Sequence, residues 1–555
     1  MKSHKIIYFL ILLLFPVIGC DDEEFLTEEP KSFNTVDNIF TSSAQVDQLL
    51  ITLYRDYRSF RVFNWQSKGH GTDVFDSPQF RINDSFSDYS RINAQSGQFS
   101  NFYNYYYQLI SRANTAIEVA NRESINWNND DERLYAIAQA RFFRAYAYGS
   151  LAELFGGVPL VTEVITEPKF DFVRSTRAET YQFAVDELES ILTDLPETTT
   201  QIGRVVRGAA QHYLTEFYLG LGIETSNDSN YDQAIAHASD LIDGGMYALM
   251  TERFGARMDE ADKDVWWDLF RINNTNYADG NTESIWTIQI DFDAYLAEDG
   301  NAVLDYPRNF MPVYRAIPGV TGVAEDVGGR GVAFIAPTEY VTDLIWDETI
   351  SENDQRNAEH NIRRTILYND PSYPEDNPGS LIGQEVPQSE IDAANAGNGW
   401  IYPIFEKLTT DQFVGLDEGQ NRSNLFRDDY AIRLAETILL RAEAYFRKGN
   451  TQAAADDINK IRSRAQCTYL VSAGEVDIDF ILDERARELL AEESRWHTLL
   501  RMGGTVAVDR IREYGLHPHA AATLTFDYNL WPIPQTVIDR NSGAVLEQNP
   551  GWVGR

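Results

Sequence analysis

One stretch constrains the fold more than any other, an unusually apolar segment that runs from Asp131 to Thr162 with the sequence DERLYAIAQARFFRAYAYGSLAELFGGVPLVT. Its apolar residues recur at three- and four-residue spacing, which predicts an α-helix with one buried stripe. Further aromatic residues make a second side of this helix apolar as well. A helix that is apolar on two sides needs partners on both. Gly156 and Gly157 end it, and Pro159 prevents it from resuming. The pattern predicts a central helix of a bundle or solenoid that carries no chemistry itself.

The net charge of the chain argues against a nucleic acid as a partner. The 555 residues include 85 acidic and 47 basic side chains, which gives a formal net charge of −38. This charge opposes attraction to nucleic acid phosphates and to anionic membrane surfaces, so we expect no nucleic acid partner. The 29 Tyr, 30 Phe and 10 Trp residues supply either a large core or stacking surfaces for sugars, and composition does not separate the two.

The N-terminus predicts export and lipid attachment. Two lysines precede an apolar run, Ile6–Ile18, that is followed by Gly19 and Cys20. The run is shorter than the about 20 residues of a membrane span, so residues 1–19 are predicted to be a signal peptide. A cysteine directly after a small residue resembles the lipobox of bacterial lipoproteins, although Val17 stands where Leu is usual. We expect lipid attachment at Cys20; an ordinary signal peptide with a coincidental cysteine is the alternative.

Residues 20–41 form a polar tether that begins with four acidic residues, Asp21–Glu24. On its own, a charge run of this kind is a solvated spacer. Acidic residues beside a lipidated cysteine also look like the surface-export signal of lipoproteins in Bacteroidetes-type bacteria. We therefore expect the protein on the extracellular side of the cell outer membrane.

The periodicity of hydrophobic residues divides the chain after the tether, residues 42–555, into three parts. Residues 42–245 are predicted to be helical, whereas residues 246–428 are rich in Gly, Asn, Asp and Pro and are predicted to form an irregular inserted lobe with short strands. Residues 429–555 are predicted to be helical and to end in an extended, Pro-containing tail that lies on a preformed surface. Ser284–Ile290 alternates like one such strand. Small and aromatic residues at fixed spacing in both helical parts resemble tetratricopeptide helix pairs, which suggests one solenoid interrupted by the lobe.

The sequence holds no sign of catalysis. The usual zinc, redox, acyl-transfer and phosphate-binding signatures HExxH, CxxC, GxSxG and GxxxxGK[ST] are absent. Carboxylate pairs for glycoside hydrolysis carry no information, because 85 acidic residues place many pairs close together by chance. His70 near Asp73 suggests a metal site, but such sites need more ligands, and a solvated pair in a loop is the favoured interpretation. We predict no metal and no cofactor.

Several separated segments together resemble the SusD/RagB family of outer-membrane nutrient-binding lipoproteins from Bacteroidetes. The order and spacing of these segments along nearly the whole chain carry the resemblance, with one small departure at His497-Thr498. Besides the lipobox and tether, the segments are Phe25–Pro30, Ala140–Tyr148, Phe155–Val161, Gly203–Arg204, Arg433–Tyr445, Glu484–Arg485, Arg495–Trp496, Pro532–Pro534 and Asn549–Trp552.

The resemblance implies a mainly α fold, a right-handed superhelix of tetratricopeptide-like helix pairs that carries a loop-rich lobe with short strands. It also implies that the protein is not an enzyme. Proteins of this family bind oligosaccharides or other nutrients at the cell surface, and they sit as a lid on a SusC-like TonB-dependent transporter to which they deliver the ligand.

Candidate ligand residues follow from the chemistry of sugars. A sugar ring needs an aromatic face, flanked by carboxylate, amide or guanidinium groups that bond its hydroxyls. In the family the ligand surface lies on the loop after the first helix and on the lobe, and Trp65, Asp73, Tyr306 and Trp400 supply these residue types in those regions. Packing in the core is the alternative for each aromatic. A protein-binding tetratricopeptide scaffold and a surface glycoside hydrolase remain as other functions.

Overall fold

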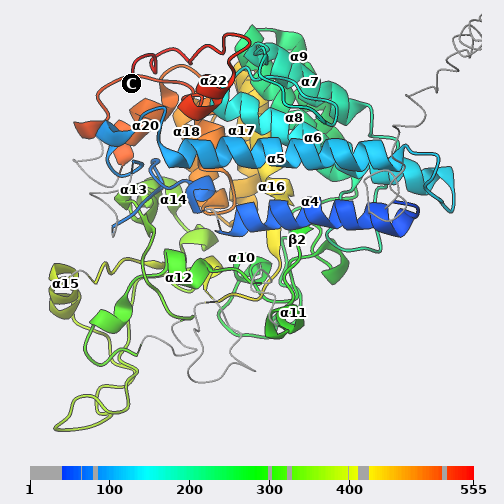
Figure 1. The fold of residues 1–555 in the computed structure, drawn as a ribbon. Helices are drawn as coiled ribbons and strands as arrows, with labels where there is room; N and C mark the ends of the chain where they lie inside the picture. The colour runs from blue at the N-terminus through cyan, green and yellow to red at the C-terminus, as the bar shows by residue number, and fades with distance from the viewer. Residues whose placement is uncertain are drawn as a thin grey trace, which may run out of the picture.

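The computed structural model describes residues 40–63, 65–78, 85–297, 303–321, 328–397, 399–409, 424–515 and 522–555. The signal peptide, Cys20 and nearly all of the tether lie outside the described residues. The described chain is mainly helical, as predicted, with a few short strands. Figure 1 shows the helices gathered above an irregular lobe that hangs below α4.

The helices that build the body and cross the lobe are α4 Ser43–Phe63, α5 Gly97–Ala120, α6 Asp130–Phe155, α7 Arg177–Glu189, α8 Arg207–Thr225, α9 Asp228–Asp243, α10 Val265–Leu269, α11 Phe292–Leu296, α12 Tyr306–Phe310, α13 Glu339–Thr342, α14 Glu348–Ser351, α15 Gln388–Ala396, α16 Leu434–Arg447, α17 Thr451–Arg464, α18 Ile478–Leu489, α19 Arg495–Arg501, α20 Val506–Tyr514 and α22 Gln535–Arg540. The strands are β1 Phe75–Asp76, β2 Ser284–Ile288, β3 Ala336–Pro337, β4 Ile362–Arg363, β5 Ile404–Phe405 and β6 Asp429–Arg433.

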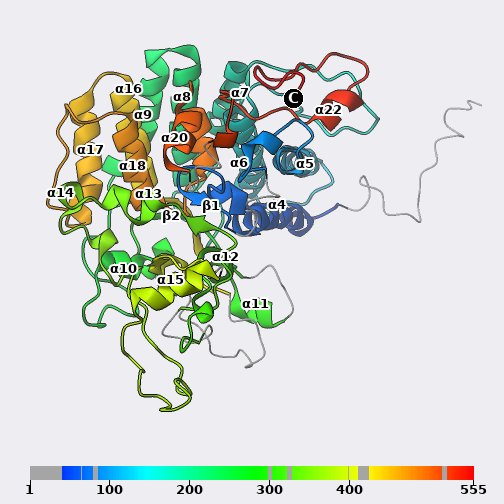
Figure 2. The same ribbon diagram turned by 90° about the vertical axis from the view of Figure 1, so that its left-hand side faces the viewer.

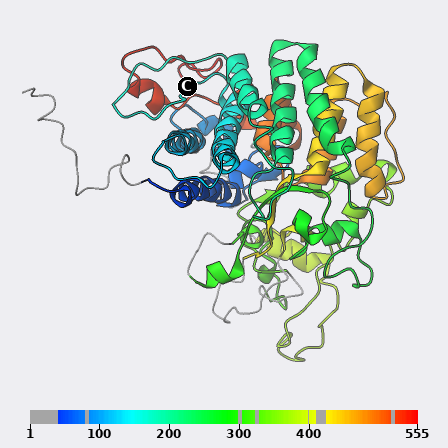
Figure 3. The same ribbon diagram turned by 90° about the vertical axis from the view of Figure 1, so that its right-hand side faces the viewer.

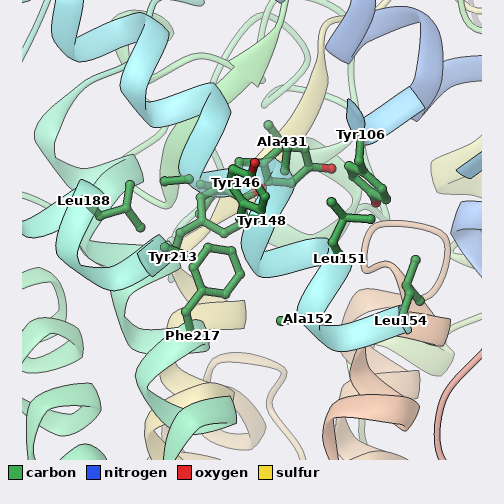
Figure 4. Close-up of a cluster of buried hydrophobic side chains, with 14 of the residues drawn as sticks. Tyr106, Tyr146, Tyr148, Leu151, Ala152, Leu154, Leu188, Tyr213, Phe217 and Ala431 are labelled. Atoms are coloured by element: carbon green, nitrogen blue, oxygen red, sulfur yellow. The ribbon is translucent and has the colours of Figure 1, made fainter. Parts of the chain in front are cut away.

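Helix α6 is the central helix that the sequence predicted. The side chain of Asn129 caps its first turn, and Gly156, with φ of 74°, ends it. Every residue from Phe142 to Phe155 is buried, because α6 packs against α4, α5, α7 and α19. Figure 4 shows side chains of α6, with those of neighbouring helices, in one buried hydrophobic cluster. The two apolar sides of α6 therefore face different neighbours.

The tail completes the C-terminal end of α6. The backbone N–H of Trp531 donates to the carbonyl of Leu154 at 2.7 Å, and the side-chain amide of Asn549 donates to the carbonyl of Phe155 at 2.8 Å. The last carbonyls of a helix have no partner within the helix, so these bonds satisfy groups that burial would otherwise leave unpaired. The Pro-rich tail lies on a preformed surface, as expected.

The predicted helix pairs stand side by side. α8 pairs with α9 and α16 pairs with α17, while α16 also contacts α9 and so joins the two pairs (Figures 2 and 3). Ala234 in α9 and Ala454 in α17 are fully buried, and their small side chains permit close packing against the partner helix. Helices from both predicted helical parts thus form one layer, and the lobe lies beneath it.

Strands tie the lobe to the helical body. β2 pairs with β6 in antiparallel fashion, with Thr287 opposite Tyr430 and Ile288 opposite Asp429. Residues 429–555 were expected to be helical from their start, but they open with β6 and the first helix begins only at Leu434. The physical reason is that β2 is buried along its whole length, so its backbone groups need a partner strand.

Substitution of Gly149 in α6 tests how closely the helices of the body are packed. A Cβ atom at this position would lie 2.1 Å from ring carbon Cζ of Phe217 in α8, which is well inside van der Waals contact. We expect Gly149→Ala to lower the free energy of unfolding by about 1–3 kcal/mol through overpacking, as measured by urea denaturation. Gly97→Ala is the control, because no atom lies within 4 Å of its added Cβ. Equal stability of the two variants would contradict the packing argument.

Candidate functional site

The loop after α4 runs between the helical body and the lobe. It opens with a 3-10 helix, η1 (Trp65–Lys68), and continues into β1, which pairs antiparallel with β3 of the lobe. The hydroxyl of Thr338 donates to the carbonyl of Asp73 at 2.6 Å, and the indole N–H of Trp496 donates to the carbonyl of His70 at 2.8 Å. The loop is therefore fixed to the lobe on one side and to α19 on the other.

Asp73 is a structural residue at the base of this loop. Its carboxylate is fully buried and accepts from Arg495, with Nη2–Oδ2 at 2.5 Å and Nε–Oδ1 at 2.9 Å, and from Arg510, with Nε–Oδ2 at 3.0 Å. Burial alone would raise the pKa of Asp73, but the two guanidiniums lower it to about 2. Asp73 cannot reach a ligand in this arrangement.

The expectation of a solvated pair of His70 and Asp73 is wrong, because both residues are fully buried. His70 instead has its Nε2 atom 3.3 Å from the Ser87 hydroxyl and 3.8 Å from the Asp76 carboxylate. In the part of the chain that the structure describes, no group of three His, Cys, Asp or Glu side chains is arranged to hold a metal ion.

Tyr306 also lies inside the protein. Only 2% of it is exposed, its hydroxyl donates to Asp429 Oδ2 at 2.5 Å, and the Lys68 ammonium lies 5.5 Å from the centre of its ring. This residue joins the lobe to β6 and η1, so its ring offers no free face to a sugar. Trp65 is the first residue of η1, and its side chain lies outside what the structure describes.

Trp400 is the candidate that reaches the surface. It is half-buried and has φ of 45°, in the left-handed region that a bulky side chain rarely adopts. Hydrogen bonds of the residues on both sides hold it there: Val313 N–H donates to the Gly399 carbonyl at 3.2 Å, and Ile401 N–H donates to the side-chain oxygen Oδ1 of Asn395 at 2.6 Å. Strain of this kind clusters at binding sites, where surrounding structure enforces it.

Three segments of the lobe come together beside Trp400. Val332 N–H donates to the Arg308 carbonyl at 3.0 Å, Ile335 N–H donates to the Asn309 carbonyl at 2.8 Å, and the Tyr402 hydroxyl donates to the Ile335 carbonyl at 3.1 Å. These bonds bring together segments that carry five residues with exposed or half-buried side chains, and we call this group the lobe face: Arg308, Arg315, Phe334, Trp400 and Tyr402.

The lobe face combines aromatic rings with guanidinium groups that have few partners. The Arg308 guanidinium lies 5.3 Å from the centre of the Phe334 ring, and its buried Nε has no hydrogen-bond partner among the described residues. Arg315 donates to the Gly331 carbonyl, and no carboxylate of a described residue lies within ion-pair distance of either arginine, although the charge of Arg308 acts on the Asp305 carboxylate. Partial burial and the neighbouring charge of Arg330 lower the pKa of Arg315. Such donors beside an aromatic face suit the hydroxyls and the apolar side of a sugar ring.

Of the three candidates whose side chains the structure describes, Asp73, Tyr306 and Trp400, only Trp400 lies at the lobe face. No sequence pattern singled out Arg308, Arg315 or Phe334, because they meet through backbone bonds between segments about 25 residues apart in the chain. The abundance of Asn and Gly around Trp400 was the only local signal of an unusual backbone there.

Two family models match the chain. A model described as "SusD family" matches residues 282–552, and one described as "Starch-binding associating with outer membrane" matches residues 24–219. The chain belongs to the SusD/RagB family. Among curated SusD relatives, SusD-like protein P2 of Formosa agariphila is 23% identical over the full length of both chains. The starch-binding protein SusD of Bacteroides thetaiotaomicron is 27% identical over 76% of this chain and 74% of its own.

Solved structures confirm the SusD fold. A SusD homologue from Bacteroides thetaiotaomicron has a TM-score of 0.70 at 19% identity, covering 94% of this chain and all of its own. A laminarin-binding SusD-like protein has a TM-score of 0.64 at 20% identity, covering 92% and 100%. NanU of Bacteroides fragilis has a TM-score of 0.67 at 19% identity, covering 94% and 99%. Within the described residues of this SusD/RagB member, no helix is both long and apolar enough to span a membrane.

The role of Asp73 predicts a pH dependence of stability. Because its pKa is lowered from 3.8 to about 2, Asp73 stabilises the fold above pH about 4, and that contribution, about 2–3 kcal/mol, is lost as the pH falls toward 2. Asp73→Asn removes the charge that pairs two buried guanidiniums, so we expect it to cost about 3–5 kcal/mol at pH 7 and less at pH 3.

Chemical denaturation of both proteins between pH 3 and pH 7 measures this difference. Asp171→Asn is the control, because the side chain of Asp171 is 65% exposed and its contact with Lys169 is 3.9 Å long. A cost for Asp73→Asn that does not change with pH would contradict the pairing.

Proposed function

We propose that the protein is a cell-surface lipoprotein that binds an oligosaccharide at the lobe face, without turnover, and delivers it to a SusC-like TonB-dependent transporter. The observation that carries the proposal is Trp400, a large aromatic residue that the lobe holds in a strained conformation at the surface, in the same group as two guanidiniums that form no ion pair with a carboxylate of the described residues. The same surface contains Phe334 and Tyr402, so aromatic faces and hydrogen-bond donors occur together.

The relatives support a glycan as the ligand. One structure of the same fold is named as a laminarin-binding SusD-like protein, and another is a surface glycan-binding protein in complex with laminarihexaose. One curated relative is a starch-binding protein. These names describe binding rather than catalysis, which agrees with the absence of catalytic motifs from the sequence.

The sequence supports the location and the partner. The signal peptide and the lipobox at Cys20 supply an anchor, and one matching family model is described as associating with the outer membrane. The acidic tether that follows Cys20 suits a body held outside that membrane. An oligosaccharide captured there needs a transporter to cross it, and the family resemblance supplies the SusC-like barrel as the partner.

Replacing Trp400 tests the lobe face. We expect Trp400→Ala to weaken binding roughly two- to tenfold, corresponding to about 0.5–1.5 kcal/mol for a lost aromatic contact. The measurement is calorimetry of the purified full chain against a panel of starch-, laminarin- and other plant- or algal-derived oligosaccharides, with product analysis in parallel.

Phe170→Ala is the control, because Phe170 is 52% exposed on the loop after α6 and takes no part in the lobe face. Unchanged affinity of the Trp400 variant would exclude this residue from the site. Release of shorter products would favour a glycoside hydrolase, and binding of no glycan in the panel would favour a protein-binding scaffold.

Replacing Cys20 tests the anchor. Cys20→Ala removes the only atom to which the lipid is proposed to attach, so we expect the protein to leave the membrane fraction and appear in the soluble fraction on immunoblots. Cys467→Ala is the matched control, since Cys467 is a free buried cysteine and its loss leaves the anchor intact. Retention of the Cys20 variant in membranes would refute lipid attachment at this position.

A further inference from the structure

A small polar cavity lies inside the helical body, where α6, α8, α16 and α19 meet. Its volume is about 30 Å³, which is enough for about two water molecules. Its lining includes Tyr146 of α6, Tyr213 of α8 and Ala431 of β6, which Figure 4 shows close together. No residue of the lobe face lines it, so it is separate from the proposed glycan site. We call it the carboxyl cavity, because four glutamates line it: Glu153, Glu216, Glu436 and Glu493.

Two of these glutamates have guanidinium partners at close range. Glu436 accepts from Arg485 at 2.9 Å, and Glu493 accepts from Arg485 at 2.7 Å and from Arg495 at 2.8 Å. Arg61 of α4 also lines the cavity, and its charge acts on Glu436. The negative charges of Glu436 and Glu493 are therefore balanced within the fold.

The other two glutamates, Glu153 and Glu216, are less well paired. Glu153 is 1% exposed, its Oε1 has no hydrogen-bond partner among the described residues, and Arg501 Nε lies 3.9 Å from it. Arg501 also pairs at 2.9 Å with Glu443, another fully buried carboxylate. Glu216 is 8% exposed and forms no ion pair with a described residue, although the charges of Arg501 and Arg485 act on it. Three buried carboxylates thus depend largely on one guanidinium.

Neighbouring groups on other elements do not make up this deficit of positive charge. Burial lowers the pKa of His212 in α8 and of His497 in α19 to about 3, so both rings are neutral at neutral pH. Arg177 in α7 acts on Glu153 through its charge, but it pairs with Glu224 at 3.4 Å. Burial also raises the pKa of the phenols nearby, so these stay neutral: Tyr146, Tyr181 and Tyr213.

Burial and like charge act on the two carboxylates in the same direction. Burial raises the pKa of Glu216 to about 7, and the neighbouring charge of Glu436 adds to the shift. Burial likewise raises the pKa of Glu153 well above its usual range, and the charge of Glu216 adds to that shift. Each carboxylate therefore makes ionisation of its neighbour less favourable.

We propose that Glu153 and Glu216 bind one proton between them across the carboxyl cavity at neutral pH, and that its loss at alkaline pH weakens the packing of α6 against α8. A protonated carboxyl group is uncharged and has one O–H donor, so it removes one of two like charges and offers the other carboxylate a hydrogen bond. Because the pKa is higher in the folded than in the unfolded chain, this stabilisation is complete below pH about 4.5 and is lost as the pH rises through about 7.

Infrared difference spectroscopy of the purified full chain between pH 5 and pH 9 tests for the proton directly. The C=O stretch of a protonated carboxyl group is distinct from that of a carboxylate. We expect a protonated band at pH 7 that disappears toward pH 9 and that is absent from both Glu216→Gln and Glu153→Gln. Glu252→Gln is the control, because Glu252 is exposed, and it should retain the band. A wild-type spectrum without such a band, or a band that both variants retain, would overturn the proposal.

Urea denaturation across the same pH range tests the effect on stability. We expect the unfolding equilibrium constant of the wild type to rise about 50- to 100-fold more than that of Glu216→Gln between pH 5 and pH 8. A purely structural role of Glu216 would shift the whole curve without changing its dependence on pH. Parallel pH profiles of the wild type and the variant would therefore contradict the proposal, whatever their difference in stability. Glu153→Gln provides the same comparison if Glu216→Gln does not fold.

Discussion

Glu488 in α18 is the point at which distant parts of the chain are joined. Its carboxylate pairs with Arg433 of β6 at 2.6 Å, with Arg356 of the lobe at 3.1 Å and with Arg464 of α17, and all of these side chains are at most 1% exposed. Burial alone would raise the pKa of Glu488, but the three guanidiniums hold it well below its usual range. Removal of one member of such a cluster leaves uncompensated buried charge and costs about 3–5 kcal/mol. The lobe is thus fixed to the helical body by charge as well as by strand pairing.

The same interaction holds the loop after α4. Asp73 lies between Arg495 and Arg510 much as Glu488 lies among its arginines, and β1 then pairs with β3 of the lobe. Buried ion pairs therefore set the position of both irregular regions relative to the helices. This explains why Asp73, whose residue type suits a sugar-binding site, has a structural role. A carboxylate near aromatic residues is equally well suited to pair with arginines in the protein interior.

Local patterns in the sequence predicted local structure well. The apolar stripe and the glycine stop gave α6 and its end at Gly156, and the alternation at Ser284–Ile290 gave β2. The partner of β2 was not predicted, because β6 is only five residues long and passes directly into α16. Asp73 and Arg495 are 422 residues apart, and a single sequence contains no signal that pairs them. The same limit applies to the lobe face, whose segments meet only through tertiary hydrogen bonds.

In this acidic protein, the presence or absence of a carboxylate partner distinguishes arginines that stabilise the fold from arginines at a surface. Inside the body, guanidiniums such as those of Arg433, Arg462 and Arg495 are each paired with buried carboxylates, so their charge is satisfied by the fold. Arg308 and Arg315 form no ion pair with a described residue, although the chain carries a large excess of acid. In a chain where carboxylates are abundant, an arginine left without one beside an aromatic surface is better explained by a ligand than by stability.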